Sequence, residues 1–354
     1  MRTVAIVAGG TSSEHEVSRW SGERVLDALD RRRYRPLFVL VEPDGNWVVD
    51  GIRRRGPLGG AEALAAARCD VALLALHGPF GEDGTIQGFL ETIGLPYTGS
   101  GVLGSSLAMD KIRTKQIVRA HGVEVAPDVV VPPAPPEWIE PTLGLPVFVK
   151  NPRGGSSLEV RLARSPEEVA RALADLGPGS GRLLVEAAIE GRELTAAILD
   201  DETGAAQALP LVEIRSRSGF FDFENKYTPG VAEEIVPAPV GAAVARRVQE
   251  IALLVHGLLG LRGMSRSDFI LAADDRPVFL EVNTIPGLTA NSLLPKAAAA
   301  AGVPFPEVLT RLVESALRVP RAATMDLAWN ASSARSGGRS TGSSTAPTAG
   351  RSSS

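Results

Sequence analysis

The 354-residue sequence is poor in the side chains that build disulfide frameworks and metal clusters. It contains one cysteine, Cys69, and only four histidines. A single cysteine forms no internal disulfide, and the flanks of Cys69 lack the spacing of a metal site. We therefore interpret Cys69 as a buried core residue and expect a reducing compartment.

Long hydrophobic runs and an excess of positive charge are also missing. No run approaches the roughly 20 apolar residues of a membrane helix. The formal net charge is -4, which does not favour binding to nucleic acid or to a membrane surface. The opening "MRTVAIVAGG" has a shorter apolar region than a signal peptide needs. These absences predict a cytoplasmic protein that binds neither partner.

The first hundred residues alternate between strand-like and helix-like patterns. The runs "TVAIVAGG", "PLFVLVE" and "DVALLALHG" predict buried strands, and residues 84–95 predict a helix. A further helix is indicated between the first two strands, with Val17, Trp20, Val25 and Leu29 as its apolar stripe. This order is typical of a mostly parallel sheet covered by helices.

The remaining chain predicts an α+β arrangement and then a tail. "PPAPPEWIEP" (132–141) reads as a stiff loop before the strand "PVFVK", and helices are expected near 166–176, 240–260 and 303–318. Polar, low-complexity sequence at the end cannot bury enough apolar surface to order itself. We expect four parts: an N-terminal α/β domain (1–103), a central domain (104–185), a C-terminal domain (186–322) and a disordered tail (323–354).

A predicted hairpin within 262–287 collects polar groups on one face. With a turn between Asp274 and Asp275, antiparallel pairing places Arg266 opposite Asn283 and Asp268 opposite Glu281. Like charges that face each other destabilise a sheet, so this pair predicts a nearby cation. Since Asp, Glu and Asn oxygens suit Mg²⁺, we expect a magnesium site here; the alternative is a surface hairpin with solvated charges.

The stretch "VKNPRGGSSLEV" (149–160) fits a phosphate-binding loop only in part. Its lysine precedes the glycines, unlike the order of the common P-loop. Lys150 at the end of a strand could place a charge on a phosphate, and Gly154 and Gly155 would let backbone N–H groups approach its oxygens. A plain turn is the alternative, and the hairpin downstream favours nucleotide binding.

The turn "GGTSSEHEVS" precedes a helix and carries two acidic residues. Thr11 with Glu14, or Ser13 with Glu16, fits a capping box. The other carboxylate would then point into the cleft at the carboxyl edge of the sheet, where it would suit an ammonium group. His77 opens onto the same edge, in a structural or a functional role.

These segments together resemble one family. The sequence is similar to D-alanine–D-alanine ligases of the ATP-grasp fold from residue 3 to about 318. The resemblance is carried by "GGTSSEHEVS", "LHGPFGEDGTIQGFLETIGLPYTGSGVLGSSLAMDK", "FFDFENKY", "RSDF" and "EVNTIPGLTANSLLPKAA". It implies three domains, ATP bound between the central and C-terminal domains, and commonly a homodimer.

The resemblance also implies roles for residues at matching positions. It implies Mg²⁺, as two ions and replaceable by Mn²⁺, held by Asp268, Glu281 and Asn283. ATP contacts are implied for Lys111, Lys150, Ser156, Ser157, Glu186, Glu193, Phe220 and Lys226. The amino-acid site is implied for Glu14, Val17, His77, Ser292 and Leu293, and direct catalytic roles for Glu14, Ser156, Tyr227, Arg266 and the backbone of Gly287.

The implied activity is ATP-dependent formation of D-alanyl-D-alanine through an acyl phosphate, as a step in cell-wall precursor synthesis. The alternative is a related ligase that takes D-serine, D-lactate or another second substrate in a resistance or natural-product pathway. Two departures from the family's phosphate loop, Asn151 for proline and Glu159 for glycine, indicate weaker ATP binding or slower closure. They also leave open a regulatory nucleotide-binding protein without catalysis.

Overall fold

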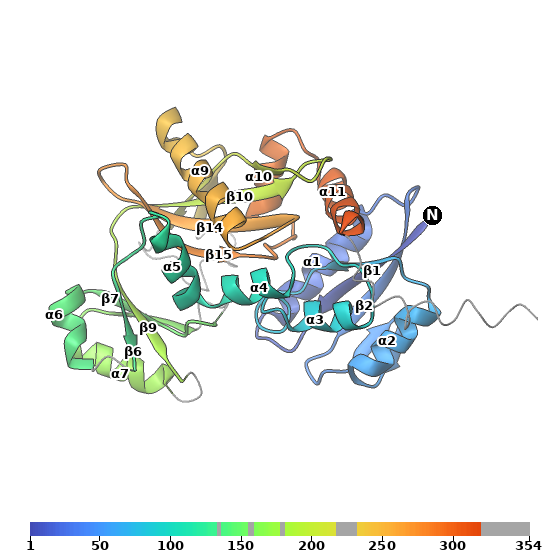
Figure 1. Cartoon of the computed structure of the whole chain (residues 1–354), viewed down its shortest axis with the longest axis horizontal. Helices are drawn as coiled ribbons and strands as arrows, with labels where there is room; N and C mark the ends of the chain where they lie inside the picture. The colour runs from blue at the N-terminus through green and yellow to red at the C-terminus, as the bar shows by residue number, and fades with distance from the viewer. Residues whose placement is uncertain (133–135, 155–158, 178–180, 217–231, 320–354) are drawn as a thin grey trace, which may run out of the picture.

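Three β-sheets organise the molecule, which a computed structural model describes over residues 1–132, 136–154, 159–177, 181–216 and 232–319. The five-stranded N-terminal sheet lies at one end and a four-stranded sheet at the other, with a six-stranded sheet between them (Figure 1). The mixed α/β and α+β fold class is as predicted. The expected disordered tail, 323–354, lies outside the described residues.

The N-terminal sheet has the strand order β4-β3-β2-β1-β5. Its strands are β1 (Arg2–Gly9), β2 (Tyr34–Val41), β3 (Trp47–Val49), β4 (Ile52–Arg54) and β5 (Val71–Leu74). Strand β1 pairs in parallel with β2 and β5, which are the three strands that the sequence predicts. The antiparallel extension through β3 and β4 was not predicted, because these strands have only three residues each. Helices α1 (His15–Ala28), α2 (Gly56–Ala66) and α3 (Thr85–Thr92) belong to this region.

Helix α1 buries small residues together with part of the predicted apolar stripe. Val25 and Leu29 are buried, but Trp20 is 48% exposed. The face toward the sheet contains Ser18, Ser21 and Gly22. A Cβ atom at Gly22 would lie 2.4 Å from the Cβ of Ala8. The helix therefore approaches β1 too closely for a large side chain, and Trp20 is turned away.

The four-stranded sheet is antiparallel, with the order β6-β9-β7-β8. Its elements are β6 (Asp128–Val131), α6 (Ile139–Leu143), β7 (Val147–Lys150), β8 (Val160–Ala163), α7 (Pro166–Leu176) and β9 (Leu183–Ala187). Helix α7 has the predicted bounds. The expected stiff loop at 132–141 is wrong in part, because a 3₁₀ turn, Pro136–Trp138, leads directly into α6. Since β9 continues to Ala187, the expected boundary between 185 and 186 falls inside this strand.

The six-stranded antiparallel sheet carries the predicted hairpin. Its strands are β10 (Arg192–Asp200), β11 (Ala206–Ala208), β12 (Val212–Ser216), β13 (Ala232–Ile235), β14 (Met264–Leu271) and β15 (Pro277–Asn283). Helices α9 (Ala242–Leu258), α4 (Val102–Met109) and α5 (Lys111–Ala120) pack against one face. The sequence assigned 104–185 to a central domain, but α4 and α5 share their core with this sheet.

The other face of the six-stranded sheet shares a hydrophobic core with the N-terminal domain. Helices α10 (Leu293–Ala300) and α11 (Phe305–Arg318) lie in this core beside β1, β2 and β5. Tyr34 donates a hydrogen bond of 2.7 Å to Glu314 of α11. Cys69 is buried in the same core, as predicted. This shared core fixes the edge of the N-terminal sheet against the hairpin β14–β15.

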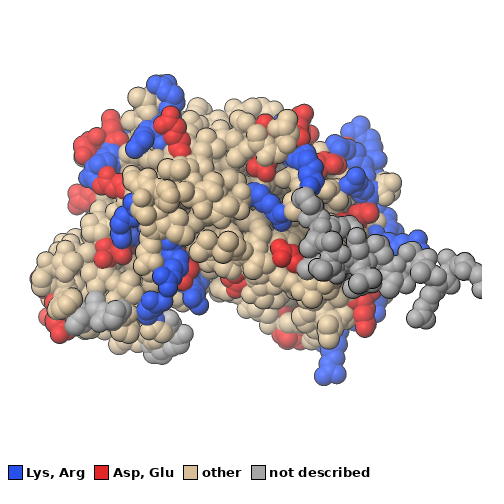
Figure 2. All heavy atoms as spheres, in the orientation of Figure 1, with Lys and Arg blue, Asp and Glu red and all other residues tan. Residues whose placement is uncertain are grey.

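Basic and acidic side chains are interspersed over the face of the molecule in Figure 2. Over the described ranges, no helix combines the length and the apolar character needed to cross a membrane.

Candidate active site

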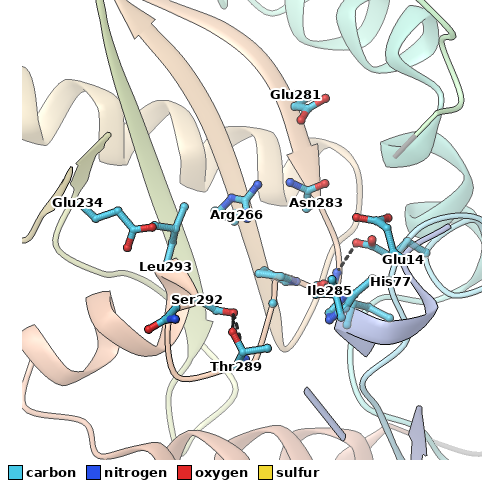
Figure 3. A pocket seen from close by; sticks show the side chains of 15 residues that line it. Glu14, His77, Glu234, Arg266, Glu281, Asn283, Ile285, Thr289, Ser292 and Leu293 are labelled. Carbon is cyan, nitrogen blue, oxygen red and sulfur yellow. Dashed lines mark hydrogen bonds between the residues drawn. The ribbon is translucent and has the colours of Figure 1, made fainter. Parts of the chain in front are cut away.

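One pocket joins the N-terminal domain to the hairpin β14–β15. Glu14 and His77 come from segments that follow β1 and β5, and Arg266, Glu281 and Asn283 come from the hairpin. In Figure 3, Glu14 lies on one side of the pocket and Ser292 and Leu293 on the other, with Arg266 and Asn283 between them. The structure also places the predicted residues Val17 and Gly287 in this lining. Their chemical roles stay predictions.

The register of the hairpin is confirmed at the four polar positions. Arg266 pairs with Asn283, and Asp268 pairs with Glu281. Residues two apart on a strand share a face, so all four side chains project from one side of the sheet. The neighbouring Phe269 is fully buried in the hydrophobic core. The hairpin therefore separates a polar face from an apolar one, as the alternation predicts.

Protein cations lie beside both carboxylates of this face. Arg266 donates two hydrogen bonds to the carboxylate of Asp268, at 2.9 and 2.8 Å. Lys111 Nζ lies 3.1 Å from Glu281 Oε2. Burial disfavours the charged form of Arg266, but Asp268 outweighs it and raises the pKa of the guanidinium. The pairing of Asp268 with Glu281 thus does not by itself require a metal ion, contrary to our argument from the sequence.

The donor set on the hairpin nevertheless fits a hard divalent cation. Within the described ranges, no group of three or more His, Cys, Asp and Glu side chains is arranged to hold a metal. The hairpin offers two carboxylates, of Asp268 and Glu281, and the amide of Asn283 on the same face. Magnesium takes few protein ligands and completes its shell with water and phosphate oxygens, so two carboxylates and one amide suffice.

The predicted capping boxes at the start of α1 are wrong. Glu14 is the N-cap residue, and no side chain caps the helix. Instead, Ser12 Oγ accepts a hydrogen bond of 3.2 Å from the amide of Glu14 and donates one of 2.9 Å to the carbonyl of His77. Ser12 therefore ties the turn after β1 to the segment after β5. This leaves the carboxylate of Glu14 in the pocket lining rather than on the helix backbone.

Close packing explains a glycine next to Glu14. Gly78 has a φ of +72°, and a Cβ atom there would lie 2.5 Å from Glu14 Oε2. Glycine adopts such positive φ values without steric cost, and it also leaves room for the carboxylate.

His77 lies in the pocket wall with both ring nitrogens engaged by the protein. Its Nδ1 is 3.0 Å from the carbonyl of Ile285, which can only accept, so Nδ1 carries the proton. Its Nε2 then accepts from the hydroxyl of Ser21 at 2.9 Å. Burial lowers the pKa of His77 to about 4, so the ring is neutral. These contacts indicate that His77 positions the segment around Ile285.

Glu82 is a pocket residue that the sequence analysis missed. It is 8% exposed, and its two oxygens accept hydrogen bonds from the amides of Gly78 (2.9 Å) and Ile285 (2.8 Å). Burial, together with the nearby charge of Glu14, raises the pKa of Glu82 to about 7. Its position in "GEDG", a turn-like sequence, gave no sign of burial.

A buried ionic network surrounds Glu186 on β9. Lys115 of α5 and Lys150 of β7 each form an ion pair with Glu186, and Lys115 also lies 3.3 Å from Asp128. Burial alone would raise the pKa of Glu186, but the two lysines outweigh it and hold the pKa near 2. Lys115 is 1% exposed and was not predicted as a site residue. The network joins α5 to the four-stranded sheet.

The two departures in the phosphate loop contact each other. Asn151 Nδ2 donates a hydrogen bond of 2.7 Å to Glu159 Oε2, and the amide of Asn151 donates one of 3.1 Å to the carbonyl of Glu159. Lys111 Nζ donates to the carbonyl of Gly154 in the same loop, at 2.7 Å. This contact holds Lys111 beside the loop that follows Lys150, a second predicted phosphate-binding lysine.

Glu193, on β10, is a further predicted site residue that the structure describes. Glu193 of β10 is two positions from Thr195, which pairs with Asp268, so Glu193 belongs to the same sheet face as the hairpin's polar groups. The remaining predicted residues, Ser156, Ser157, Phe220, Lys226 and Tyr227, fall outside the described residues.

Two models of known protein families match this chain. A family model described as the D-ala D-ala ligase N-terminus matches residues 3–100, and one described as the D-ala D-ala ligase C-terminus matches residues 130–314. The chain belongs to the D-alanine–D-alanine ligase family. The resemblance inferred from the sequence motifs is thereby confirmed.

Relatives in this ligase family match this chain over almost their whole length. The D-alanine–D-alanine ligase of Syntrophobacter fumaroxidans is 43% identical over 320 residues, which cover 89% of this chain and 97% of the relative. A crystal structure of the D-alanine–D-alanine ligase from Bacillus anthracis has a TM-score of 0.76 at 32% identity, covering 90% of this chain and 98% of that one. A D-Ala:D-Ser ligase from Enterococcus faecalis has a TM-score of 0.77 at 28% identity, covering 89% and 99%.

Proposed function

We propose that this protein joins two D-alanine molecules into D-alanyl-D-alanine while converting ATP to ADP and phosphate. The observation that carries the proposal is the pocket at the domain boundary. It combines Glu14, a carboxylate suited to an ammonium group, with the cation Arg266 and the polar groups of the hairpin. The named activity of the relatives in the family supports the same reaction.

The first step activates a carboxylate. An oxygen of the first D-alanine carboxylate attacks the γ-phosphorus of ATP, the bond from that phosphorus to the bridging oxygen breaks, and ADP leaves. Glu14 binds the ammonium of this D-alanine and orients it. Lys111 and Lys150 neutralise phosphate charge, which matters because phosphoryl transfer depends on alignment and charge stabilisation.

The second step forms the peptide bond. The neutral amine of the second D-alanine attacks the acyl carbon, the carbon–oxygen bond to phosphate breaks, and the nitrogen loses one proton. An oxyanion develops on the acyl oxygen in between. Arg266 and the backbone N–H of Gly287 stabilise this oxyanion, and the segment of Ser292 and Leu293 receives the second carboxylate.

A divalent cation completes the proposed site. Asp268, Glu281 and Asn283 would hold two Mg²⁺ ions, and Mn²⁺ could replace them. Bound there, the metal supplies charge neutralisation for the triphosphate. Arg266 then has a second task, since its two hydrogen bonds orient the carboxylate of Asp268.

In this proposal, the adenosine end of ATP binds between the four- and six-stranded sheets. Glu186 and Glu193 would hold the base and the ribose. Glu186 supports this role because two lysines keep it ionised at a buried position. A fixed charge of this kind can orient a ligand with little motion of its own.

The proposal also retains three expectations about the whole protein: three domains, a cytoplasmic location and a homodimer. The four-stranded sheet has a hydrophobic core of its own, which supports a separate central domain. The dimer rests on family resemblance, and light scattering on the purified protein would test it. The role in peptidoglycan precursor synthesis follows from the product.

Phosphate release and product mass together test the function. With ATP, Mg²⁺ and D-alanine, we expect D-alanine-dependent phosphate release and one product with the mass of D-alanyl-D-alanine. Competition with D-serine and D-lactate at several pH values should leave this dipeptide as the main product. A dominant mixed dipeptide or depsipeptide would favour the alternative ligase. Absence of D-alanine-dependent phosphate would end the enzyme proposal and favour a regulatory nucleotide-binding protein.

A further inference from the structure

The segment 284–292 after β15 has no regular secondary structure, yet it lines the pocket. Its backbone polar groups therefore lack ladder partners. The amide of Ser292 donates a hydrogen bond of 3.1 Å to the carbonyl of Thr289, and several other groups of the segment rely on side chains, because buried unpaired groups are costly. Several partners come from the N-terminal domain. Glu82 and His77 bind the amide and the carbonyl of Ile285, and Ser21 Oγ lies 3.4 Å from the amide of Leu288.

Arg24 of helix α1 makes the next contacts along this segment. Its Nη1 donates to the carbonyl of Leu288 at 3.0 Å and to the carbonyl of Thr289. The guanidinium also lies over the ring of Phe305 at the start of α11, 4.1 Å from the ring centroid. Since Leu288 is fully buried, its carbonyl has little access to water as a replacement partner. One cation thus connects α1, the pocket segment and α11.

Leu288 and Thr289 are followed in the chain by Ser292, which is predicted to bind the second amino acid. The amide of Thr289 donates to Ser292 Oγ at 3.0 Å, and the two hydroxyls are 2.8 Å apart, as the dashed line in Figure 3 marks. Ser292 is also the N-cap residue of α10. Gly287, on the other side of Leu288, lines the pocket. Arg24 itself is not part of the lining, so any effect on substrate passes through Leu288 and Thr289.

We propose that Arg24 is a positioning residue for the second amino acid: it holds Leu288 and Thr289 so that Gly287 and Ser292 face the incoming carboxylate and the oxyanion. The inference rests on the proposed function for its substrate. Arginine suits the task because one planar guanidinium donates to two successive carbonyls while its face packs on an aromatic ring. A displacement of about 1 Å in such a segment can lower a rate by about 100-fold.

The test compares Arg24→Met and Arg24→Lys with a matched control on the same helix. Arg19 is the control because its hydrogen bonds go to Glu16 and Glu23 at the surface. For each variant, the KM values for ATP and for the second D-alanine are measured, together with hydrogen exchange of the amides in 285–293. Circular dichroism checks the fold, and Arg24→Gln replaces Arg24→Met if that variant does not fold.

In Arg24→Met we expect the KM for the second D-alanine to rise about tenfold and these amides to exchange about tenfold faster, while the KM for ATP changes less than about twofold. Arg24→Lys should be intermediate, and Arg19→Met should match the wild type. Exchange and KM values equal to those of Arg19→Met would overturn the proposal. Faster exchange with an unchanged KM would also overturn it, because Arg24 would then be structural only. If the wild-type protein makes no dipeptide, the proposed function fails, while exchange still decides whether Arg24 holds the segment.

Discussion

Asn151 and Glu159, the two residues that depart from the family's phosphate loop, are hydrogen-bonded to each other. The side-chain bond from Asn151 Nδ2 to Glu159 Oε2 is 2.7 Å, and a backbone bond of 3.1 Å runs beside it. Proline and glycine, which are usual at these positions, could make neither the side-chain bond nor, in the case of proline, the backbone one. The two departures therefore act as one coupled change at the base of the loop.

We predict that this pair is energetically coupled. Asn151→Ala and Glu159→Ala should each lower the free energy of unfolding, and the double variant should lose less than the sum of the two. The expected coupling is about 1 kcal/mol, the usual size for one such hydrogen bond. Urea denaturation of the four proteins measures it. Additive effects would show that the two side chains act independently.

Substitution of Arg266 should strongly reduce the rate of the reaction. Arg266→Ala removes the proposed oxyanion donor and leaves Asp268 opposite Glu281 without its bidentate partner. Loss of one such donor lowers kcat by about 100- to 1000-fold in other enzymes. We expect a loss of that size in kcat, with a much smaller change in ATP affinity. Arg266→Lys keeps the charge and should recover only part of the rate, because lysine lacks the paired donors. A wild-type kcat in Arg266→Ala would refute the role.

The hairpin register was predictable because one face had to be polar and the other apolar. The predicted pairing nevertheless depended on a feature that the sequence did not reveal. Near the turn, Leu271 pairs with Pro277 and Phe269 with Phe279, one residue out of step with the predicted register. An irregularity between Asp268 and Phe269 restores the predicted pairing at Asp268 and Glu281. Without this bulge, the two carboxylates would not face each other.

The residues that the sequence analysis missed are those whose role depends on distant contacts. Glu82 meets Ile285, 203 positions later, and Arg24 meets Thr289, 265 positions later. Periodicity and motif spacing report on neighbours along the chain, so they cannot identify such pairs. Trp20 was misplaced for a related reason, since the closeness of α1 to β1 is set by Gly22 and Ala8.

Glu82 should give the protein a measurable pH dependence of stability. Its pKa is raised to about 7 in the folded state from an ordinary 4.5. The folded state therefore binds this proton more tightly, and the contribution is fully present below pH 4.5 and lost as pH rises through 7. The pKa difference corresponds to about 3 kcal/mol at most.

Glu82→Gln removes this titration, although it also costs one acceptor at every pH because an amide has only one oxygen. Relative to the wild type, the variant should therefore become more stable as pH rises from 5 to 8. Chemical denaturation across this range measures the difference. A difference in stability that does not change with pH would contradict the raised pKa.

Lys115 should contribute to stability far more than a partly exposed lysine does. Lys115→Met leaves Glu186 buried with one cationic partner, and removing one member of a buried pair costs about 3–5 kcal/mol. The matched control is Lys296→Met, since Lys296 pairs with Glu234 at 2.5 Å but its side chain is 35% exposed. Exposed pairs contribute about 0–1 kcal/mol. Equal losses in the two variants by urea denaturation would mean that burial of the Glu186 network has no special effect.

Removal of divalent metal should stop the reaction. The carboxylates of the hairpin should determine the Mg²⁺ concentration that gives half-maximal activity. With EDTA we expect no D-alanine-dependent phosphate release, and Mg²⁺ or Mn²⁺ should restore it. Asp268→Asn replaces a carboxylate by a weaker neutral donor, so half-maximal activity should require at least about tenfold more Mg²⁺. Asp274 offers a control on the same hairpin, because its side chain is 63% exposed at the turn. Asp274→Asn should keep the wild-type Mg²⁺ dependence. Identical Mg²⁺ titrations for the two variants would place the metal on other residues.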